Sequence, residues 1–225
     1  MVIGMLMFPD MTQLDFTGPY EIFTKLPGAE VRTVSLSAGP VVANGGLRFL
    51  PDARVDDAPA FDVLFVPGGP GVGAVMEDRA LLGFVRERGL HARYVTSVCT
   101  GALILGAAGL LKGYRATTHW LSLDLLPLFG AIPVSDRVVI DGNRITGGGV
   151  TAGIDFALSM AAEIGSPETA RMIQLVIEYN PAPPFASGHP SLADASLVEE
   201  VREARKAQQQ QREEQAKRAA AWYCG

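Results

Sequence analysis

Short apolar runs alternate with segments of helical periodicity through most of the chain. Four short segments predict strands at residues 2–8, 31–36, 61–66 and 94–98, and those at 2–8 and 61–66 are apolar at nearly every position. Helical spacing predicts helices at residues 12–26, 81–88, 154–165 and 166–179. Strands that are apolar on both faces need helices on both sides. The pattern therefore predicts an α/β fold, a three-layer sandwich around a mostly parallel sheet.

Two further segments carry the signature of β-hairpins. The stretch "GPVVANGGLRFLPD" at residues 39–52 is expected to turn on Asn44-Gly45, and "RVVIDGNRIT" at residues 137–146 on Asp141-Gly142-Asn143. Between them, "RATTHW" predicts a short strand and "LSLDLLPLF" a helix. No internal repeat is present.

The composition changes near residue 190. Residues 197–221 are rich in Glu, Arg, Lys, Gln and Ala and include the run "QQQQ". We expect an α/β domain over residues 1–190 and a charged helical tail over residues 191–225. Because acidic and basic residues are mixed along it, the tail is predicted to be a solvated helix available for packing on a partner subunit, rather than a nucleic-acid arm.

Overall composition narrows the function classes. The 225 residues are 48% apolar and 19% charged with a net charge of −5, which is typical of a globular protein and disfavours nucleic acid as a partner. We find no apolar run of membrane-spanning length and no basic leader before the first strand, so a cytoplasmic location is predicted. Two cysteines and three scattered histidines predict neither a disulfide framework nor a metal site.

The segment "RYVTSVCTGALILGAAGLLKG", residues 93–113, places Cys99 where a strand ends and a helix begins. Such a turn lifts one side chain above the carboxyl end of the sheet, where open α/β folds bind ligands. The N-terminus of the following helix favours the thiolate, and Gly101 permits a tight turn. We therefore predict a nucleophile elbow at Cys99. A structural core thiol is the alternative, since free cysteine is often buried. Cys224, in the polar tail, is predicted to be a bystander.

Two more side chains are candidates for proton transfer. Asp15 lies between Leu14 and Phe16 in "TQLDFTGPYEIF", and an acid in this setting either caps the helix or works in a site. Burial would raise its pKa and make it a usable acid at neutral pH. His119, 20 residues after Cys99 (119 − 99), is either a base or a hydrogen-bonded structural residue.

Two glycine-rich loops are expected to approach the same site. "PGGPGVG" at residues 67–73 lacks the spacing of a dinucleotide fingerprint, and the N–H groups of Gly68 and Gly69 are predicted to face an oxyanion beside Cys99. "GGGVTAG" at residues 147–153, which contains Gly149 and Val150, is expected to bring backbone close to the substrate. Both loops are alternatively tight turns.

Long motifs connect these candidates. With "LDFTGPYEIF", "PGGPGVGAVMED", "ARYVTSVCTGALILGAAGLLKGYRATTHW", "TGGGVTAGIDFAL" and "EYNPAPPF", the chain resembles the PfpI-type, class I glutamine-amidotransferase-like superfamily and, within it, the isocyanide (isonitrile) hydratases. The resemblance covers about residues 1–190.

The resemblance implies a flavodoxin-like fold and a homodimer. It places the nucleophile at Cys99, the acid at Asp15 and a helping hydroxyl at Thr100, where relatives with protease or glyoxalase activity commonly carry histidine. The implied reaction is hydration of a small isocyanide to an N-substituted formamide through a cysteine thioimidate, without a cofactor.

Three alternatives remain open at this point. One is another cysteine-dependent activity of the superfamily, of the glyoxalase or deglycase type. Another is a ligand-sensing domain like those of AraC-type regulators, which the tail of about 35 residues disfavours because it is shorter than a helix-turn-helix module. The third is a redox sensor in which Cys99 oxidises.

Overall fold

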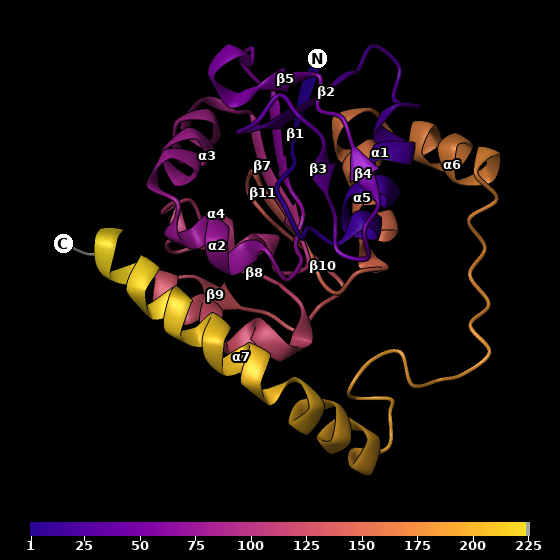
Figure 1. The fold of residues 1–225 in the computed structure, drawn as a ribbon. Coiled ribbons are helices and arrows are strands. Elements are labelled where there is room, and N and C mark those ends of the chain that lie inside the picture. The colour runs from indigo at the N-terminus through magenta and orange to yellow at the C-terminus, as the bar shows by residue number, and fades with distance from the viewer. Residues whose placement is uncertain (224–225) are drawn as a thin grey trace.

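The computed structural model describes residues 1–223, and Cys224 lies outside the described residues. A seven-stranded sheet with the order β10-β11-β7-β6-β1-β2-β5 forms the centre of the molecule (Figure 1). Every neighbouring pair in this sheet is parallel except β10 with β11. The predicted, mostly parallel sheet is therefore confirmed. Its strands are β1 (Val2–Leu6), β2 (Glu30–Ser35), β5 (Ala53–Arg54), β6 (Val63–Val66), β7 (Tyr94–Val98), β10 (Val138–Asp141) and β11 (Arg144–Gly147).

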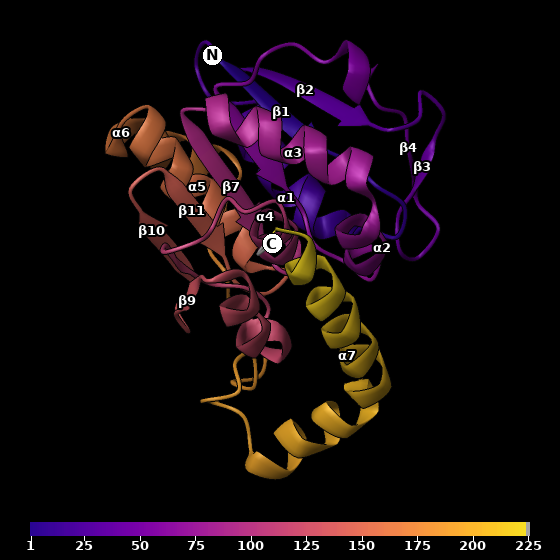
Figure 2. The same ribbon diagram turned by 90° about the vertical axis from the view of Figure 1, so that its left-hand side faces the viewer.

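Helices cover both faces of this sheet, as Figures 1 and 2 show from two directions. The central strands β6 and β7 are buried along their whole length, which explains why β6 is apolar throughout, while β7 also contains the buried polar residues Thr96 and Ser97. The three-layer prediction is confirmed. One face carries α1 (Gln13–Phe23), α5 (Ala152–Ile164) and, outside them, α6 (Pro167–Val176), and the other carries α2 (Val72–Glu77), α3 (Arg79–His91) and α4 (Gly101–Ala107).

Small elements complete the domain. Both predicted hairpins form, since β3 (Val41–Val42) pairs antiparallel with β4 (Arg48–Phe49) and β10 pairs antiparallel with β11. The strand β8 (Arg115–Ala116) is shorter than the segment "RATTHW" predicted and pairs with β9 (Ile132–Pro133). The 3-10 helices are η1 (Val55–Asp57) and η2 (Trp120–Phe129), and η2 contains Pro127, which cannot donate a backbone hydrogen bond.

The helix α2 was not predicted from the sequence. Because residues 67–73 are rich in glycine and proline, the sequence predicted a loop over this whole segment. The helix nevertheless forms because Val72, Val75 and Met76 recur at helical spacing and are buried. Asp78 then caps α3 by accepting hydrogen bonds from the backbone N–H groups of Ala80 and Leu81 at 2.9 and 3.0 Å.

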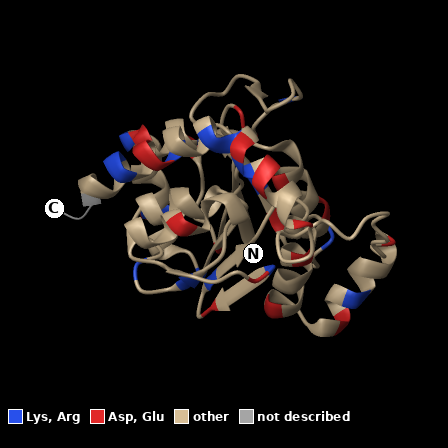
Figure 3. Cartoon of the chain, turned by 90° about the horizontal axis from the view of Figure 1, so that it is seen from below, with Lys and Arg blue, Asp and Glu red and all other residues tan. Residues whose placement is uncertain are grey.

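The C-terminal helix α7 (Ala195–Tyr223) follows an exposed segment at residues 177–194 that runs along one side of the molecule (Figure 1). It packs against α2, α4 and η2. Acidic and basic side chains are mixed along it (Figure 3). The prediction of a solvated helix holds only for its outer face, because Arg212, Ala216 and Ala219 on the inner face are buried. No helix within residues 1–223 is both long enough and apolar enough to cross a bilayer.

Candidate active site

Cys99 stands at the sharp bend between β7 and α4. Its φ of 53° lies in the left-handed region, which costs a residue with a side chain about 1–3 kcal/mol unless neighbours hold it there. Three hydrogen bonds do so. The Cys99 N–H donates to the carbonyls of Gly147 and Gly148 at 3.0 and 2.7 Å, and the Thr118 hydroxyl donates to the Cys99 carbonyl at 2.7 Å. This is the strand-to-helix geometry expected for a nucleophile elbow.

The bend also requires glycine after the cysteine. A Cβ on Gly101 would lie 2.3 Å from the carbonyl oxygen of Val66 on the neighbouring strand β6. Any side chain there would push α4 away from the sheet and move Cys99 with it. The sequence pattern around Cys99 therefore has a direct steric reason.

Asp15, in the first turn of α1, is fully buried beside Cys99. Its Oδ2 accepts a hydrogen bond from the Gly68 N–H at 3.0 Å, while Oδ1 has no nitrogen or oxygen donor within residues 1–223. Burial raises the pKa of Asp15 from 3.8 to about 7, against smaller opposing effects of hydrogen bonds from Cys99 and Gly68. The raised pKa expected from the sequence is confirmed. This carboxyl can both accept and donate a proton near neutral pH.

The thiol of Cys99 is only 4% exposed, and this decides its ionisation. Burial raises its pKa well above the usual value, and the nearby charge of Asp15 raises it further. The Thr100 N–H at the start of α4 and the charge of Arg212 act in the opposite direction but are weaker. The start of the helix favours the thiolate, as the sequence predicted, but desolvation outweighs this effect and the thiol is protonated at rest.

Gly68, Gly69 and Thr100 form a tight junction beside this pair. The Gly69 N–H donates to the Thr100 Oγ1 at 3.0 Å, and a Cβ on Gly68 would lie 2.5 Å from the Thr100 nitrogen and 2.9 Å from the Asp15 Oδ2. The oxyanion role predicted for Gly68 and Gly69 is contradicted, since both N–H groups are already bound to side chains. They hold Asp15 and Thr100 in place instead.

His119 lies at the edge of the site. Its Nδ1 accepts a hydrogen bond from the Leu121 N–H at 3.3 Å, which caps η2 and leaves the ring proton on Nε2. Burial, with the charges of Arg212 and Arg205, lowers its pKa to about 4, so the ring is neutral at pH 7. Among the described residues no hydrogen bond joins His119 to Cys99 or Asp15, which fits the structural alternative. Gly149, next to the half-buried Val150, is close enough that a Cβ would lie 3.5 Å from the imidazole Cδ2.

Arg212, which lies next to the site, was not predicted from the sequence. Arg212 of α7 is 7% exposed, and its guanidinium donates to the Ser122 Oγ at 3.3 Å and to the Gly69 carbonyl at 3.5 Å. A signal was present, since residues spaced by four and three share one face of a helix. Those residues are Arg205, Gln209, Arg212, Ala216 and Ala219.

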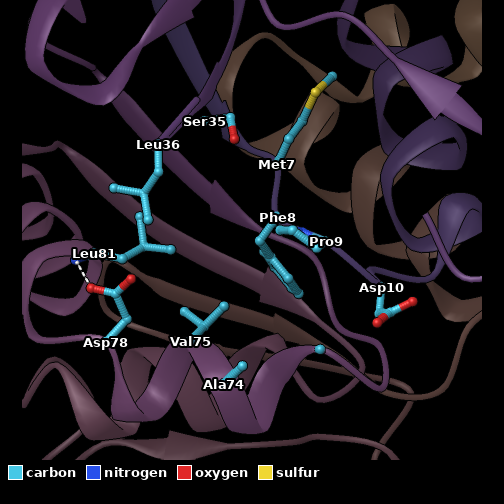
Figure 4. A pocket seen from close by; sticks show the side chains of 11 residues that line it. Met7, Phe8, Pro9, Asp10, Ser35, Leu36, Ala74, Val75, Asp78 and Leu81 are labelled. Carbon is cyan, nitrogen blue, oxygen red and sulfur yellow. Dashed lines mark hydrogen bonds between the residues drawn. The ribbon is translucent and has the colours of Figure 1, made fainter. Parts of the chain in front are cut away.

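A separate cavity of about 280 Å³ lies beyond the ends of β1 and β2 (Figure 4). It is lined by residues 7–10, by Ser35 and Leu36, and by side chains of α2 and α3. Cys99 and Asp15 do not line it. The described residues contain no group of three His, Cys, Asp or Glu side chains placed to hold a metal ion.

The structure is an α/β sandwich in which a cysteine at a strand-to-helix bend lies beside a buried carboxyl. This is what the resemblance to the PfpI-type, class I glutamine-amidotransferase-like superfamily implied. Residues 1–163 match the DJ-1/PfpI family, and the chain belongs to it. Within that family, it is 55% identical over 201 residues to the isonitrile hydratase of Pseudomonas putida, covering 89% of this chain and 88% of that protein.

Two further comparisons set the limits of this similarity. A crystal structure of a ThiJ/PfpI family protein from Pseudomonas syringae superposes with a TM-score of 0.93 at 46% identity, covering 96% of this chain and 90% of the other. The HTH-type transcriptional regulator GbdR of Pseudomonas aeruginosa is 32% identical over 185 residues, which is 79% of this chain but only 50% of the regulator. The α/β domain is thus shared by proteins of different function.

Proposed function

We propose that this protein hydrates isocyanides to N-substituted formamides, with Cys99 as nucleophile and Asp15 as the proton carrier. The observation that carries the proposal is the pair itself, a buried carboxyl with a pKa of about 7 facing a buried thiol at a strand-to-helix bend. The 55% identity to an isonitrile hydratase supports the choice of substrate. Catalytic groups need pKa values near the working pH, and Asp15 meets that requirement.

The first chemical step is addition of sulfur to the terminal carbon of the isocyanide. Because the thiol is protonated at rest, Asp15 takes its proton as the carbon–sulfur bond forms. The isocyanide carbon then holds an electron pair and takes that proton from Asp15. The product is a thioimidate in which sulfur, hydrogen and a C=N bond share one carbon.

The second step is hydrolysis of this thioimidate. Asp15, now ionised, accepts a proton from water as the water oxygen bonds to the carbon, and it passes the proton to nitrogen. The carbon–sulfur bond breaks as the C=O bond forms, and the last hydroxyl proton returns to the pair of Cys99 and Asp15. One isocyanide and one water give one formamide, so the cycle balances without a metal or organic cofactor.

The neighbouring residues position these groups. We assign to Thr100 the task of holding the Gly68-Gly69 junction, whose first N–H binds Asp15, and of orienting water with its remaining hydrogen-bonding capacity. His119, Gly149 and Val150 are assigned to the substrate-facing edge, where a neutral imidazole suits an uncharged apolar substrate.

The test is formamide production from an aryl isocyanide, followed by mass spectrometry. The Cys99→Ala variant should lose turnover, while the matched control Cys224→Ala should keep it. Turnover of methylglyoxal with no formamide from several isocyanides would instead favour a glyoxalase-type activity. Duplex-DNA binding at physiological salt would favour the sensor domain of a regulator. Light scattering checks the homodimer that the family resemblance implies.

A further inference from the structure

Arg212 is a buried charge without an acidic partner at contact distance. Among residues 1–223, none of the ion pairs includes it, whereas Arg218, two turns further along α7, pairs with Glu77. The groups that Arg212 binds are neutral, namely the Ser122 hydroxyl and the Gly69 carbonyl. The Gln209 amide, in the orientation that satisfies both of its ends, also accepts from Arg212 at 3.0 Å. Burying an unpaired cation is costly, so its retention calls for a negative charge nearby.

The hydrogen bonds of Arg212 lead directly to the Cys99 site. The Gly69 carbonyl that it binds also accepts from the Thr100 hydroxyl at 3.4 Å, and the Gly69 N–H donates back to Thr100 at 3.0 Å. Thr100 follows Cys99 in the chain. Once Cys99 has given up its proton, its anionic sulfur favours the charged form of Arg212. The helix α7 therefore joins the junction that holds the reactive pair.

The other charged groups around the thiol do not take over this task. Asp15 is negative when ionised and opposes a second negative charge on Cys99. His119 is neutral at pH 7, and Arg205 of α7 acts on that imidazole. Glu77 of α2 is occupied by Arg218 and Gln215 of α7. Arg212 is thus the cation placed to compensate charge at sulfur.

We propose that α7 is part of the active site and that Arg212 is a positioning residue whose positive charge stabilises the anionic sulfur formed when Cys99 gives up its proton. The effect of Arg212 on turnover rests on the proposed isocyanide hydration. The effect of Arg212 on the reactivity of the Cys99 thiol does not, because it can be measured with any electrophile that reacts with the anionic sulfur. A sequence-distant helix then controls the reactivity of the nucleophile.

The test is the rate of alkylation of Cys99 by iodoacetamide between pH 7 and pH 9, in a Cys224→Ala background so that one cysteine remains. Arg212→Met removes the charge at similar length, Arg212→Lys keeps it, and Arg218→Gln is the control on the same helix. An opposite charge nearby changes a thiol pKa by about one pH unit, so Arg212→Met should react about tenfold more slowly. Arg212→Lys should stay within about threefold of the parent, and Arg218→Gln should match it.

Two outcomes would overturn the proposal. Equal slowing in Arg212→Met and Arg212→Lys would show that shape matters and charge does not. Unchanged or faster alkylation in Arg212→Met would show that Arg212 only anchors α7. Faster limited proteolysis within residues 177–194 would then show that α7 has detached from the domain. Since no isocyanide is used, absence of isocyanide hydration would count against the proposed function alone.

Discussion

Replacing Asp15 by asparagine should reveal the energetic cost of keeping an acid in this site. The folded protein holds the Asp15 pKa at about 7, whereas the ordinary value is 3.8, a difference of about 3 pH units. At about 1.4 kcal/mol per pH unit, ionising this carboxyl costs the folded state up to about 4 kcal/mol. Because the folded pKa is raised, this stability is fully present below pH 3.8 and is lost as the pH rises to about 7.

Asparagine removes this pH dependence but introduces its own cost. Its oxygen can still accept from the Gly68 N–H, while its NH₂ group takes the place of the unpartnered Oδ1 and lacks an acceptor, at about 1–2 kcal/mol. At pH 5 the cost of the raised Asp15 pKa in the parent is nearly equal to the cost of the unpaired NH₂ group in Asp15→Asn, so the two proteins should be about equally stable. At pH 8 we expect Asp15→Asn to be more stable than the parent by about 1–3 kcal/mol, and to lose activity by about 10² to 10⁴-fold.

The assay is urea unfolding at pH 5 and pH 8, at one protein concentration because assembly would change the apparent stability. Asp136→Asn, which replaces an exposed acid, is the matched control and should follow the parent at both pH values. A stability difference between parent and Asp15→Asn that stays the same from pH 5 to pH 8 would refute the burial argument.

Three other measurements test the same site. The kcat/KM for isocyanide hydration should fall as the pH drops below about 7, because Asp15 must be ionised to accept the Cys99 proton, and this acid limb should vanish in the residual activity of Asp15→Asn. Gly68→Ala should lower kcat at least tenfold, since its Cβ would lie 2.5 Å from the Thr100 nitrogen, and a fully active variant would contradict the packing. Asp78→Ala should cost about 1 kcal/mol in thermal unfolding by uncapping α3, with kcat unchanged.

The central part of this fold could be predicted from local sequence. The strand β6 is covered on both faces and is apolar at every position, and the hairpin turns needed glycine where φ is positive. The bend at Cys99 was equally readable, because the strand, the nucleophile and the close-packed Gly101 are contiguous. The helix α2 was not, since Gly73 within it and the glycines and prolines just before it disfavour a helix, and burial of one face stabilises it.

What the sequence determined by itself was the α/β class, the position of Cys99 and the candidacy of Asp15, because each depends on neighbours within a few residues. The tertiary structure alone decided which partners those groups meet. It turned the Gly68 and Gly69 N–H groups toward Asp15 and Thr100, and it brought Arg212 across more than a hundred positions of sequence to the Gly69 carbonyl. It also decided the protonation state, because the pKa of Cys99 follows from desolvation, which depends on everything packed around the sulfur rather than on the residues beside it in the chain.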